Sequence, residues 1–138
     1  MWLFLLDTNI ASFLAKGTSP ALVHRARSVQ RTELVISTIT EAEMRFGFER
    51  LPPEAKLRVT IPEFLESMES APWDSFCAQR YGPLAAAQQK SGKPLSIADT
   101  MIAAHALALG LTLVTNDKAF SHIKGLRVED WTKGPHPS

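Results

Sequence analysis

Short apolar runs alternate along the chain with longer segments in which apolar residues recur every three or four positions. Such runs are typical of strands buried on both faces of a parallel sheet, and such segments are typical of amphipathic helices. The pattern predicts strands over residues 2–6, 34–37, 71–73, 111–115 and 126–128. It predicts helices over residues 8–16, 20–31, 38–50, 54–70, 74–91, 94–109 and 118–122.

Glycines and prolines mark the ends of several predicted elements. A glycine directly follows three of the predicted helices, where it favours termination: Gly17, Gly92 and Gly110. Pro62 is expected to interrupt the helix that contains it, because proline removes a helical hydrogen bond. Pro72 is expected to place the third strand at an edge of the sheet, because it has no N–H to offer a neighbouring strand.

The alternation of strands and helices predicts an α/β fold with three layers, in which a short central parallel sheet of about five strands is flanked by helices. A length of 138 residues suits a single domain. We place that domain at residues 1–133 and expect residues 134–138 to form a flexible C-terminal tail. With 45% apolar and 21% charged residues, the composition is that of a globular protein and excludes a disordered chain.

Cysteine content and the length of the apolar runs exclude further classes. The single Cys77 excludes an internal disulfide and a cysteine-rich zinc site. The most apolar stretch, residues 101–114, is 14 residues long, whereas a membrane span needs about 20. The N-terminal segment has no basic region of the kind found in signal peptides. We therefore expect a soluble, cytoplasmic protein that does not enter a membrane.

The net charge of +1 excludes a strong overall field, but the charges are unevenly distributed. Residues 8–32 and 75–98 carry basic residues and no acid, whereas the middle of the chain is rich in glutamate. The two basic segments are either ordinary solvated helix faces or two basic lips around an acidic centre.

Four acidic residues stand near the ends of predicted elements: Asp7 after the first strand, Glu43 in the helix after the second, Asp99 in the first turn of the helix before the fourth, and Asp117 after the fourth. Ligands of an open parallel sheet bind beyond the carboxyl ends of its strands, so we expect these side chains to converge there. Clustered carboxylates repel one another and favour a cation. Oxygen ligands without a His–Cys cluster favour Mg²⁺ or Mn²⁺, and such a site can activate water and neutralise charge on a phosphate.

Each of these acids also has a plainer explanation. Asp7 and Asp117 can cap the helices that follow them, and Asp99 can complete a capping box with Ser96. Asp99 nevertheless shares a helical face with the apolar stripe that should contact the core. A carboxylate in that position must be paired, protonated or bound to a cation.

Two neighbouring glutamates compete for one place in the site. Glu41 and Glu43 are two positions apart, so on a helix they point about 200° away from each other, and only one can face the cleft. Residues Thr38 and Glu41 form a capping-box pattern, which gives Glu41 a local role at the helix start. Thr40 and Glu43 form the same pattern, so this choice stays open. We assign Glu43 to the site because its neighbours are more apolar.

Four segments of the chain resemble a known family. They are residues 5–9 (LLDTN), 36–47 (ISTITEAEMRFG), 97–104 (IADTMIAA) and 113–117 (LVTND). Together they resemble the PIN-domain family and, within it, the VapC toxin ribonucleases of bacterial toxin–antitoxin pairs. Each segment alone is a weak signal, whereas the four in this order are specific. The resemblance runs from about residue 3 to Trp131.

The resemblance implies a Mg²⁺-dependent endoribonuclease that forms a homodimer and is held inactive by a VapB-type antitoxin. It implies an acidic site made of Asp7, Glu43, Asp99 and Asp117. Some relatives carry Asn where this chain has Asp117, and many carry a further acid where it has Ala119, so we expect no fifth carboxylate.

Polar and basic residues acquire candidate roles from the same resemblance. The three polar neighbours of the acids would orient ligands or water: Thr8, Asn9 and Thr115. Their alternative role is that of ordinary turn and cap residues. The basic segments would hold RNA phosphates, with these candidates: Arg25, Arg27, Lys90 and Lys93.

Two other functional classes remain open at this stage. One is a non-catalytic RNA-binding or partner-binding module on the same fold. The other is an aspartyl phosphatase, because Asp7 after the first strand resembles the nucleophile of haloacid-dehalogenase enzymes. Those enzymes usually carry a second Asp where this chain has Asn9, which weakens that alternative.

Overall fold

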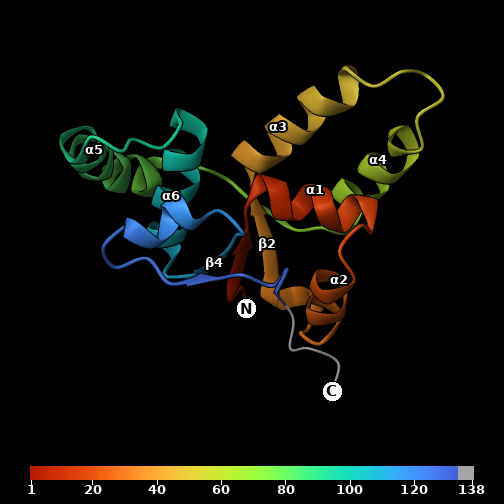
Figure 1. Ribbon diagram of the computed structural model, residues 1–138, viewed down its shortest axis with the longest axis horizontal. Coiled ribbons are helices and arrows are strands. Elements are labelled where there is room, and N and C mark those ends of the chain that lie inside the picture. Colours follow the sequence, from red (N-terminus) through yellow and green to blue (C-terminus); the bar gives the residue numbers. More distant parts are fainter. Residues whose placement is uncertain (134–138) are drawn as a thin grey trace.

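A five-stranded parallel sheet forms the centre of the computed structural model, which describes residues 1–133 (Figure 1). Its strands are β1 (Phe4–Leu6), β2 (Leu34–Ser37), β3 (Ser70–Ala71), β4 (Thr112–Val114) and β5 (Val128–Glu129). They lie in the order β3-β2-β1-β4-β5, and every neighbouring pair is parallel. The predicted α/β fold is confirmed, whereas the predicted tail at 134–138 lies outside the described residues.

The helices cover both faces of the sheet (Figure 1). They are α1 (Thr8–Lys16), α2 (Pro20–Arg27), α3 (Thr38–Glu49), α4 (Leu57–Ser67), α5 (Ser75–Ser91) and α6 (Ile97–Leu109). Two short 3₁₀ helices are η1 (Arg31–Glu33) and η2 (Lys118–His122). Within the described residues no helix has the length and hydropathy needed to cross a lipid bilayer.

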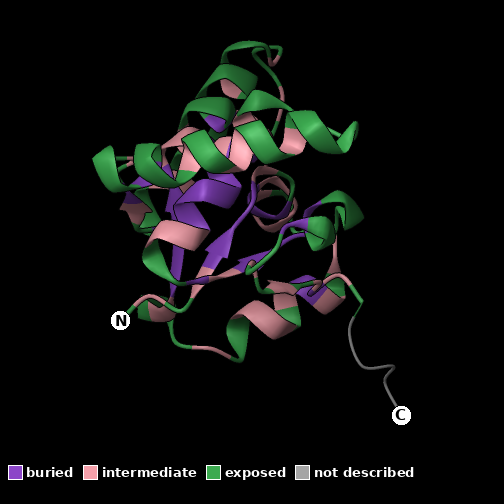
Figure 2. Cartoon of the chain, turned by 90° about the vertical axis from the view of Figure 1, so that its left-hand side faces the viewer, coloured by how far each residue is buried: buried purple, intermediate pink, exposed green. Residues whose placement is uncertain are grey.

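Alternate residues of the central strand separate the two apolar cores. Leu6 packs in a cluster with residues of α1, α2, α3 and α4, whereas Leu5 packs in a cluster with residues of α6 and with Phe120. Successive side chains of a strand point to opposite faces, so one strand holds both helical layers. Figure 2 shows the buried strands and the inner helix faces in purple, with the exposed outer helix faces in green. The predicted three-layer arrangement is thereby confirmed.

The register of the strands brings three chain segments to one edge of the sheet. Leu6 pairs with Ile36 on one side and with Val114 on the other. The next residues along the chain are Asp7, Ser37 and Thr115, and they therefore lie together beyond the carboxyl ends of the strands. Connections from β1 and β4 diverge there, which makes this edge the expected binding place of an open α/β sheet.

Several helix boundaries differ from the prediction. The second helix ends at Arg27, where Ser28 follows as its C-cap, instead of reaching Arg31. The helix expected from residue 94 begins only at Ile97, because the Ser96 side chain accepts a hydrogen bond from the N–H of Asp99. The helix expected over 54–70 is confined to α4.

Two prolines, one inside a helix and one after a strand, have different effects. Pro62 does not interrupt α4: it lies within the helix on the exposed face, where water can replace the N–H that proline lacks. Pro72 directly follows β3, which is an edge strand as predicted, although the strand consists of Ser70–Ala71 and lies one residue earlier than expected.

Candidate active site

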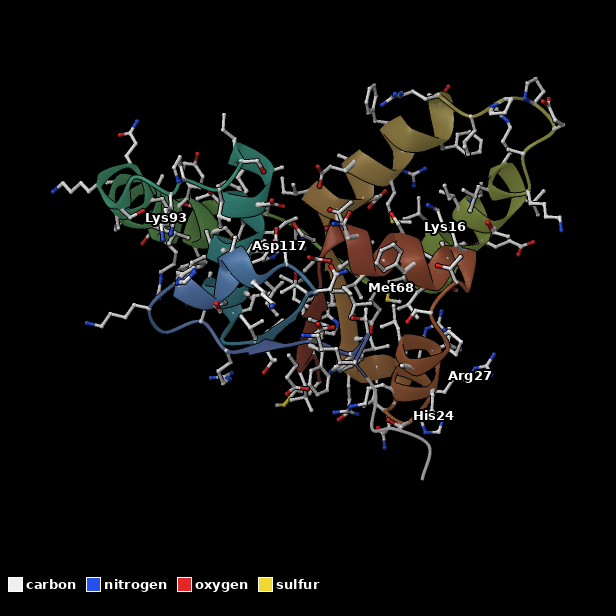
Figure 3. All side chains as sticks on the ribbon, viewed as in Figure 1. Lys16, His24, Arg27, Met68, Lys93 and Asp117 are labelled. Atoms are coloured by element: carbon white, nitrogen blue, oxygen red, sulfur yellow. The ribbon has the colours of Figure 1, made fainter. Side chains whose placement is uncertain are left out.

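Four carboxylates meet at the carboxyl edge of the sheet. Asp7 follows β1, Glu43 lies in α3, Asp99 lies in the first turn of α6, and Asp117 precedes η2. Their charges act on one another: Asp99 and Asp117 repel Asp7, while Glu43 and Asp117 repel Asp99. The structure thus brings together the four acids that the sequence singled out. Figure 3 labels Asp117 near the centre of the molecule.

Asp7 is the most deeply buried of the four, with 4% of its surface exposed. One carboxylate oxygen accepts a hydrogen bond from the N–H of Ile10 at 2.8 Å, and the other accepts one from the Thr115 hydroxyl. The first bond makes Asp7 the N-cap of α1. The pKa of Asp7 is raised to about 6, chiefly by burial and further by the charges of Asp99 and Asp117, while these two hydrogen bonds act in the opposite direction.

Asp99 is partly exposed at the start of α6. Burial raises its pKa above the usual range, and the charges of Glu43 and Asp117 add to that shift. Two acids whose ionised forms are disfavoured by burial and by neighbouring negative charge make a place where a cation is strongly attracted.

Glu43 and Glu41 point to different parts of the molecule. The Thr8 hydroxyl donates a hydrogen bond to Glu43 Oε1 at 2.5 Å, which joins α3 to the start of α1 beside Asp7. Glu41 forms an ion pair with Arg45 at 2.8 Å and accepts a hydrogen bond from the Ser70 hydroxyl at 3.1 Å. Glu43 therefore lies toward the acidic cluster, and Glu41 lies toward β3.

The expected capping box at the start of α3 is wrong. Ser37 is the N-cap, because its hydroxyl oxygen accepts a hydrogen bond from the N–H of Ile39 at 3.0 Å. The Thr38 hydroxyl instead accepts a hydrogen bond from the N–H of Trp73 at 3.2 Å. The prediction failed because a helix start that directly follows a strand can use the last strand residue as its cap.

Thr115 connects two of the carboxylate residues. Its hydroxyl donates to Asp7 and accepts a hydrogen bond from the backbone N–H of Asp117 at 3.0 Å. Asp117 in turn caps η2 by accepting from the N–H of Ala119 at 2.9 Å. Of the three polar helpers expected from the sequence, Thr8 and Thr115 contact acids, while no hydrogen bond within residues 1–133 involves the side chain of Asn9.

The donor set consists of carboxylate and hydroxyl oxygens, which suits a hard divalent cation. In the described part of the chain, no group of three or more acidic, histidine or cysteine side chains is already converged closely enough to hold an ion. The neighbouring acids are nevertheless close enough for their charges to raise the pKa of Asp7 and of Asp99. The residues therefore fit a divalent metal chemically, and binding one would require their side chains to converge further.

Arg25, one of the predicted RNA-binding residues, packs away from the edge of the sheet that carries the carboxylates. The Arg25 guanidinium is 4.7 Å from the ring centre of Trp131 and 5.7 Å from that of Phe4, and it pairs with Glu129 at 3.7 Å. Phe4 begins β1, at the opposite end of the strand from Asp7. These contacts give Arg25 a packing role between α2 and the C-terminal segment. Figure 3 shows Arg27 and Lys93 on opposite sides of Asp117.

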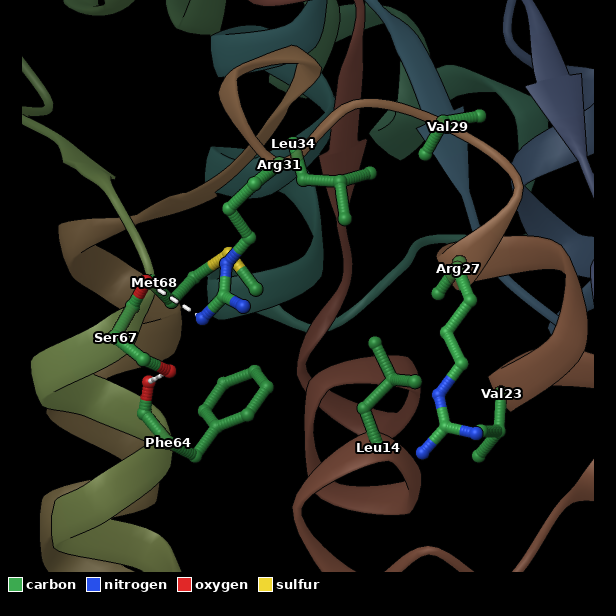
Figure 4. A pocket seen from close by; sticks show the side chains of 10 residues that line it. Leu14, Val23, Arg27, Val29, Arg31, Leu34, Phe64, Ser67 and Met68 are labelled. Carbon is green, nitrogen blue, oxygen red and sulfur yellow. Dashed lines mark hydrogen bonds between the residues drawn. The ribbon is translucent and has the colours of Figure 1, made fainter.

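An apolar groove of about 420 Å³ lies beside α1, α2 and α4 (Figure 4). Leu14, Val23 and Phe64 contribute apolar walls, and Arg27 stands at its border. Arg31 donates a hydrogen bond to the carbonyl of Ser67 at 2.7 Å and closes one end. Sequence reasoning missed this groove, since the residues that line it come from three separate segments, residue 14, residues 23–34 and residues 64–68, and share no common spacing.

Comparison with known proteins gives consistent matches over nearly the whole chain. Residues 4–126 match the family model of the PIN domain. A tRNA(fMet)-specific endonuclease VapC from Shigella flexneri is 36% identical over 131 residues, which cover 94% of this chain and 98% of that protein.

Two solved structures show the same fold. A DNA-bound VapBC complex from Salmonella typhimurium contains a chain with a TM-score of 0.87 and 32% identity, covering 95% of this chain and 99% of that one. A structure of VapBC2 from Rickettsia felis, bound to a DNA fragment from its promoter, contains a chain with a TM-score of 0.83 and 26% identity. The match covers 92% of this chain and 97% of that one.

Proposed function

Because the chain belongs to the PIN-domain family and resembles VapC proteins over nearly its whole length, we propose that it is a metal-dependent endoribonuclease and the toxin of a VapBC-type toxin–antitoxin pair. The observation that supports this function most directly is the group of four neighbouring carboxylates at the carboxyl edge of the sheet, where Asp7 and Asp99 are each repelled by two other acids. A phosphodiester is itself an anion, so these acids need a cation before such a substrate can approach them.

Asp7, Glu43, Asp99 and Asp117 would hold Mg²⁺, with Mn²⁺ as a substitute. When bound, the ion supplies an activated water and offsets negative charge on the phosphate. Thr115 keeps the Asp7 carboxylate and the Asp117 backbone in fixed relation, and Thr8 does the same for Glu43. These hydroxyls orient the acids so that little rearrangement is needed when RNA binds.

This chemistry predicts the ends of the products. Water attacks phosphorus and the RNA 2′-hydroxyl takes no part, so cleavage leaves a 5′-phosphate and a 3′-hydroxyl. The test is incubation with total RNA, with and without Mg²⁺, followed by sequencing of the ends. Asp99→Asn serves as the site variant and Glu54→Gln, at an exposed residue, as the matched control. Ends bearing a 2′,3′-cyclic phosphate would refute the mechanism. RNA binding without metal-dependent cleavage would indicate a non-catalytic module instead.

A VapB-type antitoxin is the proposed protein partner, since the structural relatives are VapBC complexes. We propose that an amphipathic antitoxin segment lies along α1, with apolar side chains in the groove beside Leu14 and a basic side chain at the carboxylates. A guanidinium pairs bidentately with carboxylates and would displace the metal. α1 joins the two places directly, because Asp7 caps it and Leu14 lies in its last turns.

We further propose that the active protein is a cytoplasmic homodimer. Large apolar side chains remain exposed on several helices, among them Phe46, Phe76 and Ile97, at 64%, 70% and 73%. A second copy of the chain that covers such side chains would remove apolar surface from water, which favours association. Sedimentation of the protein without antitoxin measures the state of assembly.

A further inference from the structure

A second concave surface lies between α5, the C-terminal half of α6 and the segment that follows η2. It has a volume of about 350 Å³, within the range of pockets that bind small ligands. Leu84 of α5, Leu107 of α6 and Ile123 form an aliphatic floor. We call this surface the α5–η2 groove; the proposed mechanism uses none of its residues.

The border of the α5–η2 groove is basic. Arg80, His122 and Lys124 line it, and no acidic residue does. The two ion pairs within residues 1–133 join other residues, and no side-chain hydrogen bond there engages any of these three groups. The charges of Arg80 and Lys124 therefore remain available to an anionic ligand, and His122 offers a ring that can donate a hydrogen bond.

Lys124 is held at a defined position by a tight turn. The N–H of Leu126 donates to the carbonyl of Ile123 at 3.3 Å, and Gly125 has a φ of +83°. That backbone conformation favours glycine, so the turn is built into the sequence. The turn thus fixes the backbone position of Lys124 beside the groove.

The surroundings of the groove carry the same sign of charge. Residues 75–98, which include all of α5, contain no acid, and neither do residues 118–128, which include η2 and the turn. These two acid-free segments, distant in the sequence, meet at the α5–η2 groove. A polyanion is therefore attracted to this side of a molecule whose net charge is only +1.

The groove lies a short distance from the carboxylates. Asp117 precedes η2 and His122 ends it, a span of about 10 Å at the rise of a 3₁₀ helix. Asp99 and Leu107 lie eight residues apart on α6, which is about 12 Å. A nucleic-acid strand cut at the carboxylates reaches the groove within a few nucleotides.

We propose that the α5–η2 groove binds a nucleotide of the substrate RNA that lies within a few nucleotides of the scissile bond. Arg80 and Lys124 contact its phosphates, and the base lies against the aliphatic floor with the His122 ring beside it. This inference rests on the proposed ribonuclease function and adds the path of its substrate. An acidic protein segment is the competing occupant, and the experiment separates the two.

The experiment measures binding of a fluorescein-labelled single-stranded RNA by anisotropy in EDTA, so that cleavage does not interfere, over a series of salt concentrations. The test variant is Arg80→Ala/Lys124→Ala, and the matched control is Lys56→Ala/Lys133→Ala, which removes the same charge from exposed residues elsewhere. The logarithm of the association constant for RNA falls as the logarithm of the salt concentration rises. Losing two phosphate contacts should make this negative slope shallower by about 1.4 and weaken binding about 25-fold at 0.1 M salt. The control should retain both values, and melting temperatures should be unchanged.

A second measurement localises the RNA directly. Photo-crosslinking with 4-thiouridine RNA should yield adducts on peptides that contain Leu84 or Ile123. If the protein cleaves RNA but Arg80→Ala/Lys124→Ala keeps the wild-type affinity and salt slope, the proposal of RNA binding in the groove is overturned, whereas the proposed ribonuclease function stands. A wild-type protein that neither binds nor cleaves RNA would overturn both. Loss of antitoxin binding with unchanged RNA binding would assign the groove to an acidic protein segment and also overturn the proposal.

Discussion

At the scale of single residues, Asp7 combines a structural and a chemical role. One of its oxygens caps α1 and the other is held by Thr115, while the whole side chain is almost removed from water. The cap needs only an oxygen acceptor, whereas metal binding needs a negative charge. A change from carboxylate to amide therefore separates the two roles.

Asp7→Asn should stabilise the metal-free protein at neutral pH. Folding raises the pKa of Asp7 from 3.8 to about 6, so the folded state holds the proton more tightly than the unfolded state. The free energy of unfolding thus falls as pH rises from about 4 to about 6, by up to about 3 kcal/mol. Urea unfolding in EDTA should show the variant more stable at pH 7.5 and equal to wild type near pH 4.

Addition of Mg²⁺ should stabilise the wild-type protein and have little effect on Asp7→Asn, because ligands stabilise only a state that binds them. The control variant is Glu54→Gln, which removes an exposed carboxylate. If Asp7→Asn were more stable than the wild type by the same amount at pH 7.5 and near pH 4, the charge of Asp7 would not be the cause of the difference in stability.

Glu43→Gln and Glu41→Gln form a matched pair on one helix. Glu43→Gln should lower the rate of RNA cleavage by about 100-fold or more, since a metal ligand contributes several kcal/mol in such sites. Glu41→Gln should keep activity and lose less than about 1 kcal/mol of stability, because its ion pair with Arg45 is a surface pair. An inactive Glu41→Gln beside an active Glu43→Gln would reverse the assignment.

At the scale of elements, a buried polar contact joins the two helices that carry Glu43 and Asp99. His105 of α6 is fully buried, and its Nδ1 lies 2.8 Å from the hydroxyl of Ser37, the cap of α3. Nε2 of the same ring has no hydrogen-bond partner in the described structure. A protonated ring would leave a buried charge, so α6 and α3 are held together best by neutral histidine.

His105→Leu should reduce the loss of stability on acidification. Burial lowers the pKa of His105, and the charge of Asp74 opposes this only in part. The stability that neutral His105 provides is therefore present above pH 6.5 and is lost as pH falls below it. At pH 7.5 the variant should be less stable by about 1–3 kcal/mol, because the Ser37 hydroxyl loses its partner.

Unfolding of this variant at pH 7.5 and pH 5 measures the effect, with His24→Gln, at an exposed histidine, as the control. The contribution of Asp7 has the opposite pH dependence and is common to both proteins, so the difference between them isolates His105. If the free energy of unfolding changed by the same amount between pH 7.5 and pH 5 in His105→Leu and in the wild type, His105 would not be the source of the pH dependence.

At the scale of the whole molecule, the basic residues lie on separate sides of the sheet. Lys90 and Lys93 belong to the acid-free side at the end of α5, whereas Arg25 packs on Trp131 near the amino end of β1. Only the first pair lies on the side where the proposed groove would carry RNA.

Lys90→Ala/Lys93→Ala should make the salt dependence of RNA binding weaker, with the negative slope of log K against log salt shallower by about 1.4. The sequence-based hypothesis that Arg25 and Arg27 hold RNA phosphates predicts that charge reversal at both positions changes the affinity for RNA and its salt dependence. The packing contacts of Arg25 instead predict a stability loss of about 1 kcal/mol. Anisotropy and urea unfolding measure the two effects separately. A loss of stability with an unchanged slope would assign Arg25 to packing alone.

The element sequence and the positions of the acids could be predicted from the sequence because their signals are local. Gly17, Gly92 and Gly110 end helices with positive φ, and Asp7 and Ser96 cap helices within three residues of themselves. The apolar run before Asp7 required a strand buried on both faces, which placed that carboxylate at the edge of a parallel sheet. This much of the candidate site follows from short-range chemistry.

Other features depended on contacts between distant segments. Ser37 rather than Thr38 caps α3, and Glu43 meets Thr8 across 35 positions of sequence. Thr115 reaches Asp7 across 108 positions, because β1 and β4 are paired neighbours. The α5–η2 groove likewise exists only where two acid-free segments pack together. No periodicity records which helix face meets which neighbour, so only the tertiary structure decided how the acids are held and where the basic surface lies.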